Sequence, residues 1–425
     1  MTSEVEAQVR PVALLRQTPA AALVGVACAV SLLALSLLAE GLQHLVWTEL
    51  SGALGADPDS WWWIVGVLTV FGFAIGLVVR NAPGHAGPDP AVEELGSDPL
   101  PPLALPGLAL ALVLTLASGA SLGPENPILI INASLMVLVG MRLMAGVAAP
   151  TWMQWSLAGT FGAMFGTPVA AALLLTEALA GMGPDRSGLP VWNRLFNPLV
   201  AASTGSVVVL LTIGPQFEIA VPEYDGIALG DFAWAVGVAL VTGALGLGAS
   251  YLLTPVHRLF HRLPGPVAAL TVGGFVLGWL GVLGGPETLF KGLEEMKEIS
   301  EDVADHSAGT LVLMALVKLL ALVVAAAAGF RGGRIFPAVF VGVAAGWAVV
   351  GIFDAAPVPV VLGAAVLGIT IAAIRSGWLA LFGALIVVPD IDLLPVLLIA
   401  ALAVWLLVAG RHELHADPPP APALR

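Results

Sequence analysis

The sequence contains few of the residues on which soluble enzymes and disulfide-bonded secreted domains depend. It has one cysteine, two tyrosines and only 11% charged residues. The single Cys28 excludes an intrachain disulfide and a metal site built from paired cysteines. No nucleophile and base pair, and no metal-ligand set, recurs at helical spacing. We therefore expect no enzyme, no bound metal and no cofactor.

Apolar residues are abundant instead, at 58% of the chain with a mean hydropathy of +0.97. A membrane-spanning helix needs roughly 20 apolar residues. Runs near that length recur along the whole chain, at approximately residues 20–38, 61–79, 103–117 and 127–147. This pattern predicts an all-α polytopic protein embedded in lipid, and we expect it in the plasma membrane.

The net charge of −13 lies largely in polar loops, around residues 89–98 and 287–305. Bulk charge therefore says little about a pore, since helix N-termini attract anions without any net positive charge. We expect no nucleic acid among the partners. Arg10 and Arg16 precede the first apolar run and predict a cytoplasmic N-terminus. A signal peptide is the alternative for that run, but its length and the spans that follow favour a retained helix.

Two apolar halves are separated by a polar stretch, and this separation predicts the domain organisation. We assign residues 1–18 to a cytoplasmic N-terminal segment, 19–217 to a first membrane repeat, 218–231 to a linker, 232–410 to a second membrane repeat, and 411–425 to a disordered cytoplasmic tail. Several apolar runs are short and interrupted by Gly or Pro. Such interruptions at corresponding positions in two halves indicate an inverted repeat with a binding site at the membrane midplane.

Two interruptions are prominent, Gly-Pro-Glu-Asn-Pro at residues 123–127 and Gly-Gly-Arg-Ile-Phe-Pro at residues 332–337. A looser correspondence links residues 163–168 with 372–377. Proline is favoured in a first helical turn, so each interruption reads as a loop that opens a helix. Two such helix N-termini, if they converge, form an anion site from free backbone N–H groups. The alternative is a pair of ordinary Gly/Pro kinks.

Glu125 is the residue that favours the anion site. An ionisable side chain next to an apolar membrane run is costly to desolvate and is a functional candidate. At a helix N-terminus its carboxylate competes with an anion for the same N–H donors, and protonation releases the site. We predict that Glu125 is both gate and proton carrier; the other interpretation is a helix-capping acid at the membrane surface.

Three short stretches together resemble the signature motifs of the CLC chloride channel and transporter family, which read G-S-G-I-P, G-R-E-G-P and G-x-F-x-P. They are residues 84–88 (Gly-His-Ala-Gly-Pro), 123–127 and 333–337 (Gly-Arg-Ile-Phe-Pro), in the family's order. We name them the first, second and third motif. Residues 165–177 and Lys318 also resemble family features. The resemblance covers about residues 20–410 and implies a CLC-type inverted repeat of many tilted, partly non-spanning helices. It also implies a homodimer in which each subunit has an anion pathway gated by Glu125.

The departures from the family pattern concern residues that would touch the anion. His85 stands where the family has an anion-coordinating serine, and Pro124 replaces an arginine. Arg334 either restores that missing positive charge or is a solvated loop arginine. On the resemblance, the anion-binding residues are His85, Gly123, Asn126, Gly333, Arg334, Ile335 and Phe336.

Two further family features are altered. The central tyrosine should lie near residues 392–395, but the two tyrosines are Tyr224 and Tyr251. The inner proton-transferring glutamate corresponds to Ala178, and a shift of one residue gives that role to Glu177. Lys318 is either a structural ion-pair partner or part of an inner vestibule.

The sequence thus predicts transport of chloride or another small anion, with protons as a second candidate partner. An uncoupled channel and a fluoride-selective transporter remain open. A non-conducting membrane scaffold or sensor is the alternative from another class, because all three motifs are altered.

Overall fold

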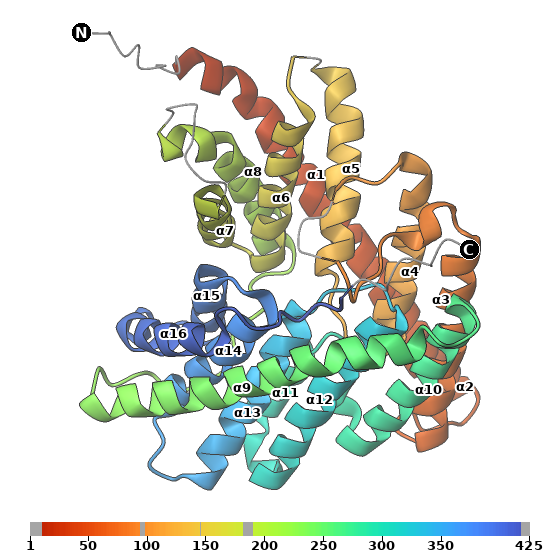
Figure 1. Cartoon of the computed structure of the whole chain (residues 1–425), viewed down its shortest axis with the longest axis vertical. Helices are drawn as coiled ribbons and strands as arrows, with labels where there is room; N and C mark the ends of the chain where they lie inside the picture. The colour runs from red at the N-terminus through yellow and green to blue at the C-terminus, as the bar shows by residue number, and fades with distance from the viewer. Residues whose placement is uncertain (1–10, 94–97, 145, 182–189, 418–425) are drawn as a thin grey trace. The chain divides into compact units, whose positions relative to one another are not determined.

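The computed structural model describes residues 11–93, 98–144, 146–181 and 190–417, and these residues are almost entirely helical (Figure 1). The first elements are α1 (Pro11–His44), the π-helix η1 (Leu45–Leu50), α2 (Ser51–Ala53), α3 (Trp61–Asn81), the 3₁₀ turns η2 (Pro83–Ala86) and η3 (Pro102–Ala104), α4 (Leu105–Ala117), α5 (Glu125–Leu143), α6 (Ala149–Phe165), α7 (Pro168–Gly181) and α8 (Val191–Thr212). The later elements are α9 (Leu229–Phe260), α10 (Pro266–Gly284), η4 (Pro286–Thr288), α11 (Leu293–Glu301), η5 (Val303–Asp305), α12 (Ala308–Ala328), α13 (Ile335–Ile352), α14 (Val358–Ile374), α15 (Gly377–Val387), η6 (Ile391–Leu393) and α16 (Leu394–Val408).

Some of these helices are long enough to span a membrane and others are not. Nine helical segments of the described chain are long and apolar enough to cross a bilayer. Four more apolar helices are shorter, namely Pro102–Ala117, Pro168–Ala180, Val358–Ile374 and Gly377–Val387. At 1.5 Å per residue, α14 with its 17 residues is about 25 Å long and falls short of a ~30 Å hydrocarbon core. The predicted polytopic helical fold with partly non-spanning helices is confirmed.

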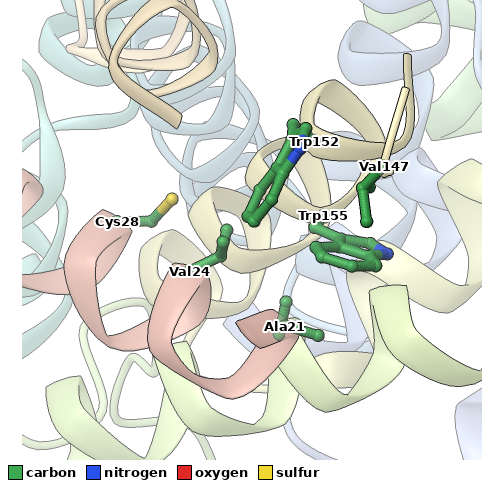
Figure 2. Packing of buried hydrophobic residues seen from close by; sticks show 7 residues of the cluster. Ala21, Val24, Cys28, Val147, Trp152 and Trp155 are labelled. Atoms are coloured by element: carbon green, nitrogen blue, oxygen red, sulfur yellow. The ribbon is translucent and has the colours of Figure 1, made fainter. Parts of the chain in front are cut away.

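The described chain forms two compact units, and the first comprises the described parts of residues 1–36, 98–102 and 128–216. Within it α6 packs against α7 and α8. Figure 2 shows part of its core, where Val24 of α1 lies near Trp152 and Trp155 of α6. The two indole rings meet edge to face with centroids 5.0 Å apart. Cys28 is buried and unpaired in this core, with its Sγ 3.6 Å from the hydroxyl of Ser156.

The second unit comprises the described parts of residues 37–97, 103–127 and 217–425. The long helix α9 packs against α12, α14 and α16, while α3 packs along α10 (Figure 1). Residues 411–417, which the sequence assigns to a disordered tail, are held in this unit. Leu414 is buried, and the N–H of Ala416 donates to the carbonyl oxygen of Ala91 across 2.6 Å. The remainder of that predicted tail, residues 418–425, lies outside the described residues.

Local backbone geometry repeats along the chain. After α4, Gly119 takes a left-handed φ of 92° before α5 begins; after α12, Gly329 takes a φ of 99° before α13 begins. α6 and α14 likewise each end in a left-handed residue, Gly166 at φ 66° and Arg375 at φ 52°, and another helix starts two residues later. The predicted motif correspondences therefore coincide with matching helix–loop–helix geometry.

Candidate functional site

Two helix starts meet in the second unit, where Gly123 and Gly333 form an antiparallel β-bridge. The N–H of Gly123 donates to the carbonyl of Gly333 across 3.0 Å, and the reverse bond measures 2.6 Å. α5 begins two residues after the first glycine and α13 two residues after the second. The first N–H groups of a helix have no partner within the helix, so both N-termini present donors close to this bridge. The bridge thus joins the second and third motifs.

The carboxylate of Glu125 occupies the start of α13. Glu125 is fully buried, and its Oε1 accepts a hydrogen bond from the backbone N–H of Phe336 across 2.7 Å. The N–H groups of Ile335 and of Glu125 itself also face this carboxylate. A negative group at this position is stabilised by free N–H donors and by the positive end of the helix dipole. An anion could use the same donors.

The second carboxylate oxygen of Glu125, Oε2, has different surroundings from Oε1. Within the described part of the chain, Oε2 is buried and has no hydrogen-bond partner. It lies against Gly333, where an added Cβ would be only 1.9 Å away. Any side chain at residue 333 would collide with the carboxylate where it now lies, so glycine allows this position of Glu125.

A cavity of about 290 Å³ is bordered by the residues that directly follow Glu125 and Gly333. Its lining includes Asn126, Arg334 and Ile335, which flank the two helix starts, and residues 373–375 and 413–415. The Oδ1 atom of Asn126 is buried and, among the described residues, has no hydrogen-bond partner. A polar amide thus borders the cavity with unused hydrogen-bonding capacity.

Cationic groups in this cavity are held by backbone carbonyls. Arg334 donates to the carbonyl oxygen of Glu93 across 2.6 Å, and Arg375 donates to that of Val408 across 2.7 Å. Burial lowers the pKa of Arg375, while the charge of Glu413 opposes that change. Two arginines and the carboxylate of Glu413 therefore border this cavity.

His85 lies apart from this cavity. Its side chain is exposed, and Nδ1 is 3.3 Å from the carbonyl oxygen of Val79 at the end of α3. Its backbone has a left-handed φ of 52° because the first motif makes a tight turn, whose carbonyl oxygens at His85, Ala86 and Gly87 accept from Arg331. His85 is not among the residues that line this cavity.

Glu177 is half-buried in α7 and belongs to the first unit. The residues that the structure does bring together around the bridge are Gly123, Glu125, Asn126, Gly333, Arg334, Ile335 and Phe336.

Sequence reasoning missed Arg331, Arg375, Glu413 and His415. Arg331 is buried, and one glycine, Gly332, separates it from the third motif. Burial lowers its pKa to about 10, with Asp89 and Glu93 opposing the change, so it stays cationic at neutral pH. The one feature of the sequence that could have pointed to Arg331 is its position near the third motif, which already contains Arg334. The residues at 413 and 415 lie beyond the stretch covered by the resemblance and carried no signal.

Comparisons with known proteins agree on one family. The family model described as voltage gated chloride channel matches residues 67–407. Relatives from Salmonella paratyphi A and Salmonella typhimurium, both named "Putative ion-transport protein YfeO", are 47% identical over 397 residues, covering 93% of this chain and 95% of theirs.

Solved structures share the fold. A CLC-type fluoride/proton antiporter matches with a TM-score of 0.75 and 18% identity, covering 98% of this chain and 100% of its own. A slow cyanobacterial Cl⁻/H⁺ antiporter matches with a TM-score of 0.74 and 18% identity, covering 93% of this chain and 96% of its own.

Proposed function

The chain belongs to the voltage-gated chloride channel (CLC) family, and we propose that it moves chloride or another small anion across the membrane past Glu125. The family membership itself supports ion transport. The observation that carries the specific proposal is the buried 2.7 Å hydrogen bond from the N–H of Phe336 to the Glu125 carboxylate. A negatively charged side chain there occupies donors that an anion needs.

Competition for these donors is the proposed gate. The ionised carboxylate of Glu125 occupies the N–H donors at the start of α13 and so blocks the anion site. When the carboxylate gains a proton it loses its charge and becomes a weaker acceptor, so the side chain can leave and an anion can take its place. The cavity of about 290 Å³ supplies the approach, with Arg334 as a nearby positive charge and Asn126 as a hydrogen-bonding group. We leave His85 out of this pathway because its side chain is exposed and directed to Val79.

Proton coupling is part of the same proposal. A gate that opens by protonation exchanges one proton with each opening, and antiport results if that proton continues to the other side of the membrane. We propose Glu177 as the second proton-transferring residue. An uncoupled channel differs in one measurable respect, because anions then move without net proton movement.

The direct experiment uses liposomes that contain the purified protein and a high internal chloride concentration. Chloride efflux and external pH are recorded together, at several pH values and voltages. We expect efflux from the wild type, accompanied by proton movement in the opposite direction. Efflux without proton movement would select the channel. Absence of efflux under every condition would contradict transport and favour a non-conducting scaffold or sensor.

Glu125→Ala tests the gate within that assay. It should change the chloride flux severalfold and remove its pH dependence, because no carboxylate then competes for the Phe336 N–H. The matched control is Glu223→Ala, which removes an exposed carboxylate from the coil before α9. If Glu125→Ala and Glu223→Ala both behave like the wild type, Glu125 is not the gate.

Anion identity is resolved by repeating the efflux with fluoride in place of chloride. The altered residues of the second motif, with Asn126 bordering the cavity, change what the site can hold, so both anions need to be compared. We propose chloride as the preferred anion; faster fluoride efflux would assign the fluoride-selective alternative.

We also propose that the chain forms a homodimer in the plasma membrane, as the family resemblance implies. Chemical cross-linking in native membranes followed by sizing in detergent measures the assembly. A chain that remains monomeric in both would contradict this part of the proposal.

A further inference from the structure

A second polar cluster lies away from Glu125, at the junction of the first motif and the end of α9. Asp89 directly follows the first motif, His257 is in the last turn of α9, and His261 stands at its C-terminus. The Nε2 atoms of His257 and His261 lie 2.9 and 3.6 Å from the same carboxylate oxygen, Oδ2 of Asp89. The three candidate ligand atoms all lie within 4.8 Å of one another.

The hydrogen bonding of His261 fixes which of its nitrogens carries a proton. Nδ1 of His261 lies 3.0 Å from the carbonyl oxygen of His257. A carbonyl oxygen only accepts, so Nδ1 carries the hydrogen and Nε2 of the neutral ring has an unshared electron pair. Nε2 lies 3.6 Å from Oδ2 of Asp89, and this carboxylate oxygen is also electron-rich. A cation between them, either a proton or a metal ion, is needed to make this contact favourable.

We propose that Asp89, His257 and His261 bind a divalent transition-metal ion of the Zn²⁺ type. Two imidazole nitrogens and one carboxylate oxygen are a common ligand set for this ion. Ligands at about 2.0–2.2 Å from a tetrahedral zinc lie roughly 3.3 Å from one another. The observed separations of 2.9 and 3.6 Å from the Asp89 oxygen bracket that value. The four-residue spacing of the histidines places both rings on one face of the helix end.

The surroundings of the cluster suit a metal ion. A cavity of about 340 Å³ borders Asp89 and His261 and leaves room for a water as the fourth ligand. His257 is almost fully buried at 1% side-chain exposure, whereas His261 is 45% exposed, so one ligand is fixed and another is open to entering ions. The hydrogen bond from Nδ1 of His261 to the carbonyl oxygen of His257 is of the kind that usually orients a metal-binding imidazole.

Arg331 borders the same cavity and is the main opposing charge. Its guanidinium donates to three carbonyl oxygens of the first motif, and the charges of Asp89 and Glu93 offset its own. A metal bound here would fasten the first motif to the end of α9, because Asp89 continues directly from that motif.

Calorimetric titration of zinc chloride into the purified full-length protein in detergent tests the site without any transport measurement. We expect one zinc ion per chain. His261→Ala should weaken binding by at least about 100-fold, since loss of an outer-shell partner alone costs 10–100-fold. Asp89→Asn should have a similar effect. His44→Ala is the matched control, because His44 is 63% exposed and faces a single carboxylate, Glu49.

Cobalt(II) gives a second readout, which reports the coordination geometry of the bound ion. Tetrahedral Co²⁺ with histidine ligands absorbs strongly in the visible range, and the spectrum should disappear in His261→Ala. Since His261 is half-exposed, its loss should leave the fold intact. Absence of zinc binding to the wild type, or wild-type affinity in His261→Ala, would overturn the proposal and leave a hydrogen-bonded Asp–His cluster.

Discussion

Gly333 and Glu125 lie so close together that no side chain fits between them. A Cβ on Gly333 would be 1.9 Å from Oε2 and 2.7 Å from Cδ of the Glu125 carboxylate. The position of the carboxylate at the start of α13 therefore depends on the absence of a side chain at residue 333. A substitution at Gly333 therefore tests the proposed gate without changing Glu125 itself.

Gly333→Ala should displace Glu125 from the N–H of Phe336. We expect chloride flux in liposomes to change severalfold and to lose its pH dependence, as in Glu125→Ala. Gly248→Ala in α9 is the control, because an added Cβ there meets nothing within 4 Å. A Gly333→Ala protein that folds and transports like the wild type would separate the carboxylate position from gating.

Lys318 is buried in α12 and bound to backbone. Its Nζ donates to the carbonyl oxygens of Thr288, Leu289 and Phe290 across 3.0, 2.6 and 2.9 Å. These contacts support the structural interpretation of Lys318 over a place in an inner vestibule. The ammonium group supplies hydrogen-bond donors to the backbone at and directly after the end of η4.

Lys318→Met should destabilise the protein by about 3–5 kcal/mol, because three buried carbonyl groups lose a charged donor. Denaturant unfolding in detergent measures the loss. Lys297→Met is the control, since its 3.4 Å ion pair with Glu294 is partly exposed and contributes about 0–1 kcal/mol. Equal effects of the two substitutions would contradict a special role for Lys318.

The buried carboxyl group of Glu295 should make the free energy of unfolding depend on pH. Burial raises the pKa of Glu295 above the ordinary 4.5, although the charge of Lys318 opposes the change. The folded state then binds a proton that the unfolded state releases, so stability is greatest at low pH and falls as pH rises from 4.5 through the folded pKa.

Glu295→Gln should remove this pH dependence. The free energy of unfolding of the variant, relative to the wild type, should increase as pH rises above the ordinary glutamate pKa. Urea titrations at a series of pH values measure it, with the exposed Glu294→Gln as the control. A constant difference between variant and wild type at all pH values would show that Glu295 does not titrate in this way.

Arg331 stabilises the first motif through three hydrogen bonds, of 2.8, 2.8 and 3.1 Å, to consecutive carbonyl oxygens. A lysine keeps the charge but cannot reproduce the planar fork of donors. Arg331→Lys should therefore cost about 1–3 kcal/mol of unfolding free energy. Thermal unfolding measures it against Arg258→Lys, whose 3.4 Å pair with Asp417 is exposed. A loss no larger than in Arg258→Lys would mean that the charge alone suffices.

The spans were predictable because a helix in lipid satisfies its own backbone hydrogen bonds, so a long apolar run has few other structures available. The short helices were predictable for the same reason, together with the Gly and Pro that end them. Glu125 was identifiable because a carboxylate between prolines at the edge of an apolar run is rare and costly. Each of these inferences needs only residues that are neighbours along the chain.

Partners distant in sequence were not predictable. Nothing near Glu125 in the sequence says that Phe336 supplies its N–H donor, and nothing near Asp89 points to His257. The first motif is a further example, since the carbonyl oxygen of His85 accepts a hydrogen bond from Arg331, which lies far along the chain.

The amino-acid sequence by itself determined the membrane fold, its family and the identity of the gating candidate, because apolar periodicity, helix-opening prolines and motif order are local properties. Only the tertiary structure decided which donors meet the Glu125 carboxylate, which carbonyls hold Lys318 and Arg331, and that Asp89 lies between two histidines. Those relationships depend on distances between helices, and a linear pattern of residues does not specify such distances.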